Sequence, residues 1–154
     1  ICFSACDSLE GIRKEIFRLE QECLITSEQA NTVDINALFT FFKSPLGKKI
    51  CNAKNVIREF KFSVLCDAGQ YYPDSTDDQI LLQGVVDLAL IEEDGITVLD
   101  FKTDRATEDS LYILSEKYKP QVRAYVNALT RIYQKPIKSA MLYFFSLNQF
   151  VDVI

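Results

Sequence analysis

The pattern of apolar and polar residues divides the chain into a helical first third and a following region of strands. Residues 8–23 carry apolar side chains at helical spacing, which predicts an amphipathic helix that packs on the rest of the chain or docks a partner. Three shorter helices are predicted at 26–30, 34–42 and 44–51. Each of them begins at or just after a Ser, Thr or Asp, the residues that favour helix starts.

Three strands are predicted after these helices, at residues 56–65, 80–92 and 96–103. The sequence Glu92-Glu93-Asp94-Gly95 has the composition of a tight turn, so the second and third strands are expected to form a hairpin. Residues 67–79 are rich in Asp, Gly, Pro, Ser and Thr, which predicts a solvated loop between the first two strands.

A further helix is predicted over residues 121–133, with Pro120 in its first turn, because apolar residues recur at helical spacing. The polar stretch at 103–115 is then predicted to be a loop. Apolar runs at 141–147 and 150–154 are short enough for two closing strands. This order of elements predicts an α/β fold in which helices cover a mixed central sheet.

The candidate chemistry lies on the predicted hairpin. Side chains alternate along a strand, so Asp100 and Lys102 share one face, and antiparallel pairing can bring Asp87 beside Asp100. Two carboxylates and a backbone carbonyl form an oxygen-rich site for a hard cation such as Mg²⁺. A lysine beside such a cation can orient a nucleophile and offset charge on phosphoryl oxygens. On the Asp-Phe-Lys triplet alone, a strand edge with exposed charges is the commoner arrangement.

The predicted helix adds a second pair of polar residues. Gln121 and Tyr125 are four residues apart and therefore lie on one helix face. Such a pair is often a solvated or rim feature of an amphipathic helix, so it carries little weight by itself.

Taken in chain order, these residues form three blocks: Gly84-Val85-Val86-Asp87, then Asp100-Phe101-Lys102, then Gln121 with Tyr125. The blocks resemble the signature of the RecB-like branch of the PD-(D/E)XK nuclease superfamily. Within this branch, the chain more closely resembles the nuclease domain at the C-terminal end of the AddA subunit in bacterial AddAB helicase-nucleases. Blocks at 58–63, 82–87, 100–104 and 116–121, and the strand at 142–145, carry this similarity, which extends from about Asn36 onward.

The resemblance implies a restriction-endonuclease-like α/β/α sandwich and a role for each candidate residue. Asp87 and Asp100 would be metal ligands, and the Phe101 carbonyl would complete the protein side of the metal site. Lys102 would be the catalytic lysine, and Asp87, Asp100 and Lys102 together would form the catalytic set.

Three further residues receive roles from the same resemblance. Gln121 and Tyr125 would lie at the rim of the active site and hold the nucleic acid strand or the lysine. Glu59 matches a recurrent glutamate of the family on an earlier strand, although an exposed strand charge explains it equally well.

The implied function is that of a Mg²⁺-dependent deoxyribonuclease, with Mn²⁺ as a possible substitute. It would act as exonuclease and endonuclease on single-stranded DNA ends unwound by an attached helicase, in double-strand-break repair and recombination. The implied partners are the helicase part of the same polypeptide and an AddB-type subunit. No Walker A sequence is present, so the chain itself is expected to contain no ATP site.

Relatives usually carry a histidine on an upstream helix that reaches the metal, whereas this chain contains no histidine. We therefore expect a fragment of a larger helicase-nuclease: one domain over 1–154, with an N-terminal helical segment at 1–35 and the nuclease core at 36–154. The alternative is a degenerate site, in which case the chain would be a non-catalytic DNA-binding or subunit-assembly module that retains the fold.

Length, charge and cysteine content bear on the number of domains, on membrane insertion, on DNA binding and on zinc or iron–sulfur sites. A chain of 154 residues that is 48% hydrophobic can bury one core, and no apolar run reaches the roughly 20 residues that a membrane span requires. The net charge of -5 argues against strong DNA binding by the chain alone. The five cysteines show no Cys-x-x-Cys spacing, so neither zinc nor an iron–sulfur cluster is indicated. A reducing cytoplasm is the simplest compartment for such cysteines, and the family resemblance implies that it is bacterial.

Overall fold

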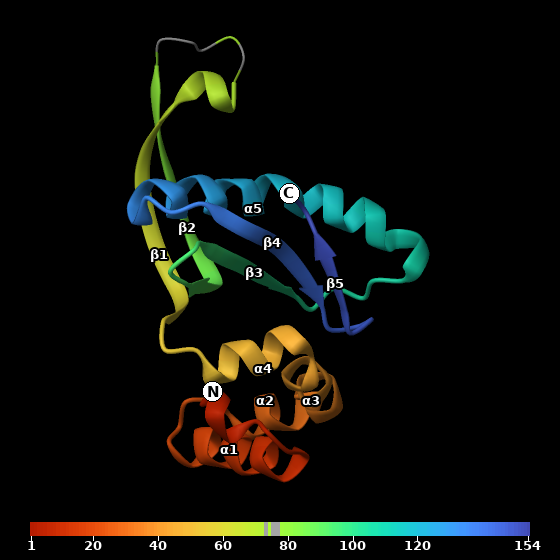
Figure 1. The fold of residues 1–154 in the computed structure, drawn as a ribbon. Helices are drawn as coiled ribbons and strands as arrows, with labels where there is room; N and C mark the ends of the chain where they lie inside the picture. Colours follow the sequence, from red (N-terminus) through yellow and green to blue (C-terminus); the bar gives the residue numbers. More distant parts are fainter. Residues whose placement is uncertain (73, 75–77) are drawn as a thin grey trace.

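A five-stranded sheet with helices on both faces forms the framework of the computed structural model, which describes residues 1–72, 74 and 78–154. The strands lie in the order β1-β2-β3-β4-β5 (Figure 1). Their bounds are Val56–Asp67, Gln79–Ile91, Ile96–Lys102, Ile137–Phe144 and Gln149–Asp152. Only β3 and β4 pair in parallel, so the sheet is mixed. The predicted α/β sandwich with a mixed central sheet is confirmed.

The predicted hairpin forms between β2 and β3. Its ladder runs from Leu88 opposite Leu99 to Ile91 opposite Ile96. β2 is much longer than β3. The first half of β2 pairs with β1 alone, and this pairing extends to Gln79 opposite Asp67. The β1–β2 pair therefore extends beyond the rest of the sheet as a two-stranded arm (Figure 1). The 3-10 helix η2, Ala68–Gln70, follows β1, while residues 73 and 75–77 of the loop predicted at 67–79 lie outside the described residues.

Four helices with side-chain caps precede the sheet, after the short 3-10 helix η1 at Phe3–Ala5. They are α1 (Leu9–Gln21), α2 (Ser27–Thr32), α3 (Ile35–Lys43) and α4 (Pro45–Asn52). Ser8, Thr26, Asp34 and Ser44 each accept a hydrogen bond from a backbone N–H of the first turn. These caps satisfy donors that a helix start leaves free, which explains why the sequence located these helices well.

The helix after β3 was predicted wrongly at its start. α5 spans Glu108–Tyr133, so most of the stretch predicted as a loop at 103–115 is helical and Pro120 lies inside the helix. Thr107 caps α5 by accepting a hydrogen bond from the Ser110 N–H, and the side-chain oxygen of Ser110 accepts one from the Thr107 N–H. Leu111 and Leu114 pack against the same apolar core as the later half of the helix, and this packing extends α5 toward its cap.

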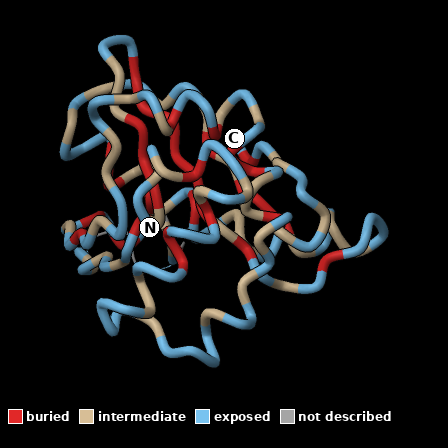
Figure 2. The backbone as a smooth tube through the Cα atoms, turned by 90° about the horizontal axis from the view of Figure 1, so that it is seen from below, coloured by how far each residue is buried: buried red, intermediate tan, exposed pale blue. Residues whose placement is uncertain are grey.

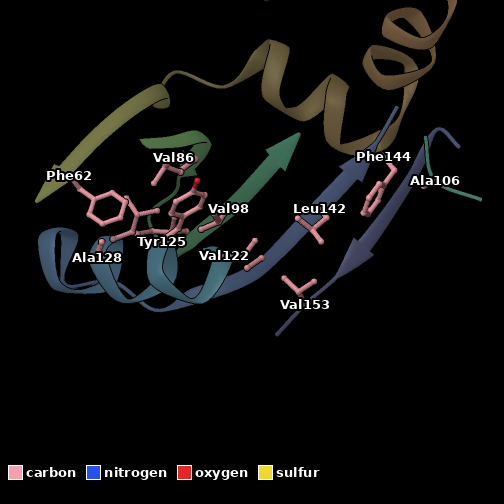
Figure 3. Close-up of a cluster of buried hydrophobic side chains, with 14 residues drawn as sticks. Phe62, Val86, Val98, Ala106, Val122, Tyr125, Ala128, Leu142, Phe144 and Val153 are labelled. Carbon is pink, nitrogen blue, oxygen red and sulfur yellow. The ribbon is translucent and has the colours of Figure 1, made fainter. Parts of the chain in front are cut away.

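Two apolar layers hold the helices against the sheet. On one face, α5 packs over a core that includes Val86, Val98, Val122 and Leu142 (Figure 3). On the other face, α1 to α4 pack through a cluster centred on Phe41. The buried segments run through the middle of the molecule, and exposed segments surround them (Figure 2). β3 lies between both layers, which is why six of its seven residues are buried.

Strands β1 and β2 change the face to which their side chains point at one shared position. Ile57 and Phe60 both pack on the α5 side, as do Val86 and Ala89, although strict alternation would separate each pair. Between them, Glu59 has a left-handed backbone with φ 49°, and the β1–β2 ladder omits the pairing of Glu59 with Asp87. The pairing register of β1 with β2 is the same before and after this position, because both strands are distorted at the same point.

None of the helices in the described part of the chain has the length and apolar character needed to cross a bilayer. All five cysteines are free thiols. Cys6 and Cys66 are buried, and burial is the main cause that raises the pKa of Cys6 to about 11.

We predict that Gly84→Ala destabilises the fold by about 1–3 kcal/mol, because overpacking a buried site has that cost. A Cβ at Gly84 would lie 2.8 Å from the ring of Phe62 and 3.5 Å from that of Tyr125. Both rings are buried and cannot move freely. Urea denaturation measures the effect, with Gln83→Ala on the exposed face as control. Equal stabilities of Gly84→Ala and the control would show that the contact is not tight.

Candidate active site

A buried ion pair on β3 forms the centre of the candidate site. Asp100 is 1% exposed and Lys102 is 9% exposed, and Lys102 Nζ lies 2.6 Å from Asp100 Oδ2. The Lys102 ammonium is thus the close partner of this buried oxygen, and no further donor meets it in hydrogen-bonding geometry among the described residues. As the alternation predicted, Val98 on the same face packs against α5, whereas Leu99 packs into the opposite layer.

α5 supplies two side chains that contact the lysine and a third that contacts one of these two. Lys102 Nζ donates a hydrogen bond of 3.0 Å to Gln121 Oε1 and lies 3.8 Å from the centroid of the Tyr118 ring. Gln121 Nε2 in turn donates to the Tyr125 hydroxyl. These positions lie three and four residues apart on one helix face, which is the spacing that places side chains side by side.

Asp87 reaches the site from the end of the β2–β3 ladder. Its Oδ2 accepts a 2.9 Å hydrogen bond from the backbone N–H of Phe101, the residue between Asp100 and Lys102. The β2–β3 ladder ends where Leu88 pairs with Leu99, and Asp87 and Asp100 are the next residues of the two strands. The charge of Asp87 also contributes to raising the pKa of Asp100, so the two carboxylates interact.

Glu59 lies beside Asp87 on the neighbouring strand. Both residues, together with Phe101, line an open cavity of about 690 Å³ between the sheet and the N-terminal helices. Glu59 is exposed, in agreement with either interpretation that the sequence left open.

Burial controls the protonation behaviour of the site. It raises the pKa of Asp100, because a charged carboxylate loses hydration there, and the Lys102 ammonium opposes that rise. Burial likewise raises the pKa of Tyr125 to about 12, so its hydroxyl is neutral and can donate a hydrogen bond.

The structure thus brings Asp100, Lys102, Gln121 and Tyr125 into one network, with Asp87 attached through the backbone of Phe101. Sequence reasoning missed Tyr118 and Asp104, whose side chains form a 2.9 Å hydrogen bond next to the lysine. A signal was available, because Leu111, Leu114 and Tyr118 continue the helical spacing of Val122 toward the N-terminus. Placing the helix start at Pro120 concealed it.

The chain matches a known protein family over most of its length. A model of the PD-(D/E)XK nuclease superfamily matches residues 33–152, a range that contains every candidate residue. The chain belongs to the PD-(D/E)XK nuclease superfamily. Superfamily membership agrees with the mixed sheet and with the clustering of an acid and a lysine on β3.

Curated relatives of the chain are named as the A subunit of an ATP-dependent helicase/nuclease. One from Bacillus cereus is 40% identical over 154 residues, covering 94% of this chain and 12% of the relative. One from Bacillus cytotoxicus is 35% identical over 156 residues, covering 95% of this chain and 13% of the relative. The chain therefore spans about one eighth of the length of the curated relatives it matches.

The donor set fits a divalent cation in one respect that can be read from the structure. Burial, and to a smaller extent the charge of the neighbouring Asp87, raises the pKa of Asp100. A divalent cation held between the two carboxylates would offset both effects. Nowhere among the described residues do three or more His, Cys, Asp or Glu side chains lie close enough together to hold one metal ion. The side chains would therefore supply at most two acidic ligands.

We predict that Tyr125 stabilises the fold below pH 10 and that this contribution disappears as the pH rises from 10 to 12. An unfolded tyrosine titrates near pH 10, whereas its folded pKa is about 12, so deprotonation favours unfolding across this window. The difference between these two pKa values corresponds to a loss of about 3 kcal/mol. Urea unfolding at several alkaline pH values should show a steeper decline for the unaltered chain than for Tyr125→Phe. Tyr112→Phe, which alters an exposed tyrosine, is the control, and a Tyr125→Phe profile that matched it would contradict the assignment.

Proposed function

We propose that this site hydrolyses phosphodiester bonds of DNA with the help of Mg²⁺ or Mn²⁺. The observation that carries the proposal is the buried Asp100–Lys102 ion pair, in which Lys102 Nζ lies 2.6 Å from Asp100 Oδ2, with the Asp87 carboxylate hydrogen-bonded to the backbone between the two residues. Burying such a pair is costly, and a fold that needed only stability would gain by replacing it with apolar residues. The pair is therefore best explained by chemistry.

Asp87 and Asp100 would hold the cation, and the Phe101 carbonyl would complete the protein ligands. Mg²⁺ usually takes one or two carboxylates together with water and substrate phosphate, which suits a site with two acids. When bound, the cation supplies Lewis-acid stabilisation of phosphoryl oxygens and lowers the pKa of water.

The other side chains would act on the substrate and on the nucleophile. Lys102 would place its ammonium against the attacked phosphate and orient the nucleophilic water. Its present contacts keep it fixed in a nearly water-free position, where its charge acts strongly. Gln121 and Tyr125 would hold Lys102 in position and bound the DNA strand at the rim. Glu59 would border the path of the strand in the cavity that it shares with Asp87.

The names of the relatives support a wider assignment. We propose that the chain acts within a helicase-nuclease on single-stranded DNA ends, alongside the helicase part of the polypeptide and an AddB-type subunit, in double-strand-break repair and recombination. The net charge of -5 is consistent with DNA that is delivered by a neighbouring motor rather than held by this chain alone. The bacterial cytoplasm is the corresponding compartment. In this arrangement residues 36–154 form the nuclease core and residues 1–35 a helical segment that precedes it.

We predict that Asp87→Asn and Asp100→Asn each weaken Mn²⁺ binding by at least about tenfold, since each removes one of few anionic ligands. Lys102→Met should still bind Mn²⁺, because both carboxylates remain, but should cleave a labelled single strand at least about 100-fold more slowly, because it removes the charge that acts on the phosphate. Calorimetry measures binding, and gel analysis measures cleavage. Asp109→Asn, an exposed acid on α5, is the control. Cleavage that continues unchanged in EDTA would contradict the proposal.

In a full-length helicase-nuclease that carries this domain, we predict that Asp100→Ala abolishes DNA cleavage and leaves ATP-driven unwinding intact. The substitution removes a metal ligand and touches no motor element. Strand separation and strand cleavage can be followed in the same reaction with a labelled duplex. Cleavage at a rate close to that of the unaltered protein would remove Asp100 from the mechanism, and a non-catalytic DNA-binding or assembly module would then be the better assignment.

A further inference from the structure

We propose that Tyr118 is a positioning residue that holds the ammonium of Lys102 through the face of its aromatic ring. This inference rests on the proposed function, in which Lys102 acts on the phosphate. The centroid of the Tyr118 ring lies 3.8 Å from Lys102 Nζ, which is well within the range of a cation–π contact. Because Lys102 is 9% exposed, water competes little with the ring for its charge.

The ring is itself fixed by contacts on the side of its hydroxyl. The Tyr118 hydroxyl donates a 2.9 Å hydrogen bond to Asp104 Oδ1. The backbone carbonyl of Asp104 accepts a 2.9 Å hydrogen bond from the Ser146 hydroxyl, which in turn accepts one from the Ala106 N–H. The segment after β3 is thereby tied to the residues that follow β4, and the ring is oriented from outside the active site.

The Lys102 ammonium needs a third partner because Asp100, its strongest partner, would also bind the cation. Lys102 contacts Asp100, Gln121 and the Tyr118 ring. In the proposed function Asp100 also holds a divalent cation, so less of its charge remains for Lys102. Gln121 supplies one neutral acceptor, and the ring supplies a second attraction that requires no carboxylate. Together they keep the ammonium directed at the phosphate.

A second lysine near the same ring must be separated from this effect. Lys117 Nζ lies 4.9 Å from the Tyr118 centroid and 3.4 Å from its hydroxyl, and Lys117 is exposed. If Tyr118 acted through Lys117, its loss would weaken binding of DNA and raise KM. If it acts through Lys102, its loss lowers kcat and leaves KM nearly unchanged.

The first experiment reads the contact without any cleavage assay. Protons next to an ammonium that lies over an aromatic face resonate upfield, so the ε-methylene signal of Lys102 should be shifted upfield in NMR spectra of the chain labelled at lysine. Lys102→Arg assigns the signal. The shift should persist in Tyr118→Phe and disappear in Tyr118→Leu, and an unshifted signal in the unaltered chain would overturn the contact.

The second experiment tests the consequence for catalysis. Phenylalanine at position 118, followed by its mono-, di- and trifluorinated forms, weakens the attraction of the ring for a cation stepwise with little change of size. We expect kcat for a labelled single strand with Mn²⁺ to fall at each step, and Tyr118→Leu to lose about 30-fold. KM should stay within about twofold throughout.

Matched variants separate the positioning role from a packing role. Tyr118→Phe keeps the ring and should retain most of kcat. Two control variants should leave kcat unchanged: Tyr112→Leu, which alters an exposed tyrosine of the same helix, and Lys117→Met. Equal kcat values across the fluorinated series would show that the ring only fills space and would overturn the proposal. A chain that keeps the upfield signal but cleaves no DNA would instead count against the proposed function, while the contact itself would stand.

Discussion

The burial of an ion pair on β3 is the constraint on which the rest of this structure depends. Apolar layers cover β3 on both faces, and at its end the strand places Asp100 and Lys102 where water hardly reaches. Removing two charges from water costs several kcal/mol per ion, and their attraction offsets this only when additional contacts are present. The protein provides these contacts for the lysine from Gln121 and Tyr118. The Lys102 ammonium in turn neutralises the buried carboxylate of Asp100.

This constraint explains why α5 is long and why it packs where it does. The helix must reach Lys102 with Tyr118 and Gln121 and must also cover the apolar face of the sheet. Tyr118, Gln121 and Tyr125 lie on the stripe that faces β3, and the Phe62 ring stacks edge-on against Tyr125. Gly84 leaves room for that ring, which links the glycine of the β2 block to the position of a side chain in the site.

The distortion shared by β1 and β2 has a related effect at the other acid. Beyond Glu59 and Asp87, β1 and β2 no longer pair with β3 and continue as a two-stranded arm. In β1, the side chains on the α5 side are odd-numbered before this point and even-numbered after it. The left-handed conformation of Glu59 costs of order 1–3 kcal/mol for a residue with a side chain, and it persists where surrounding structure demands it. Here it allows Asp87 to turn from the ladder toward the backbone of Phe101. Glu59 and Asp87 thereby come to border the same cavity.

The sequence by itself determined the hairpin, the capped helices and the sharing of one strand face by Asp100 and Lys102, because these features depend on local spacing and local hydrogen bonds. The start of α5 was mistaken, since Pro120 is a strong local signal for a helix boundary. A proline inside a helix costs about 3 kcal/mol, which packing of Leu111 and Leu114 against the core offsets. The contact of Tyr118 with Lys102, the tether through Asp104 and the paired distortion at Glu59 join residues far apart in the chain. Only tertiary packing decided these features, because no local pattern encodes which ring meets which charge.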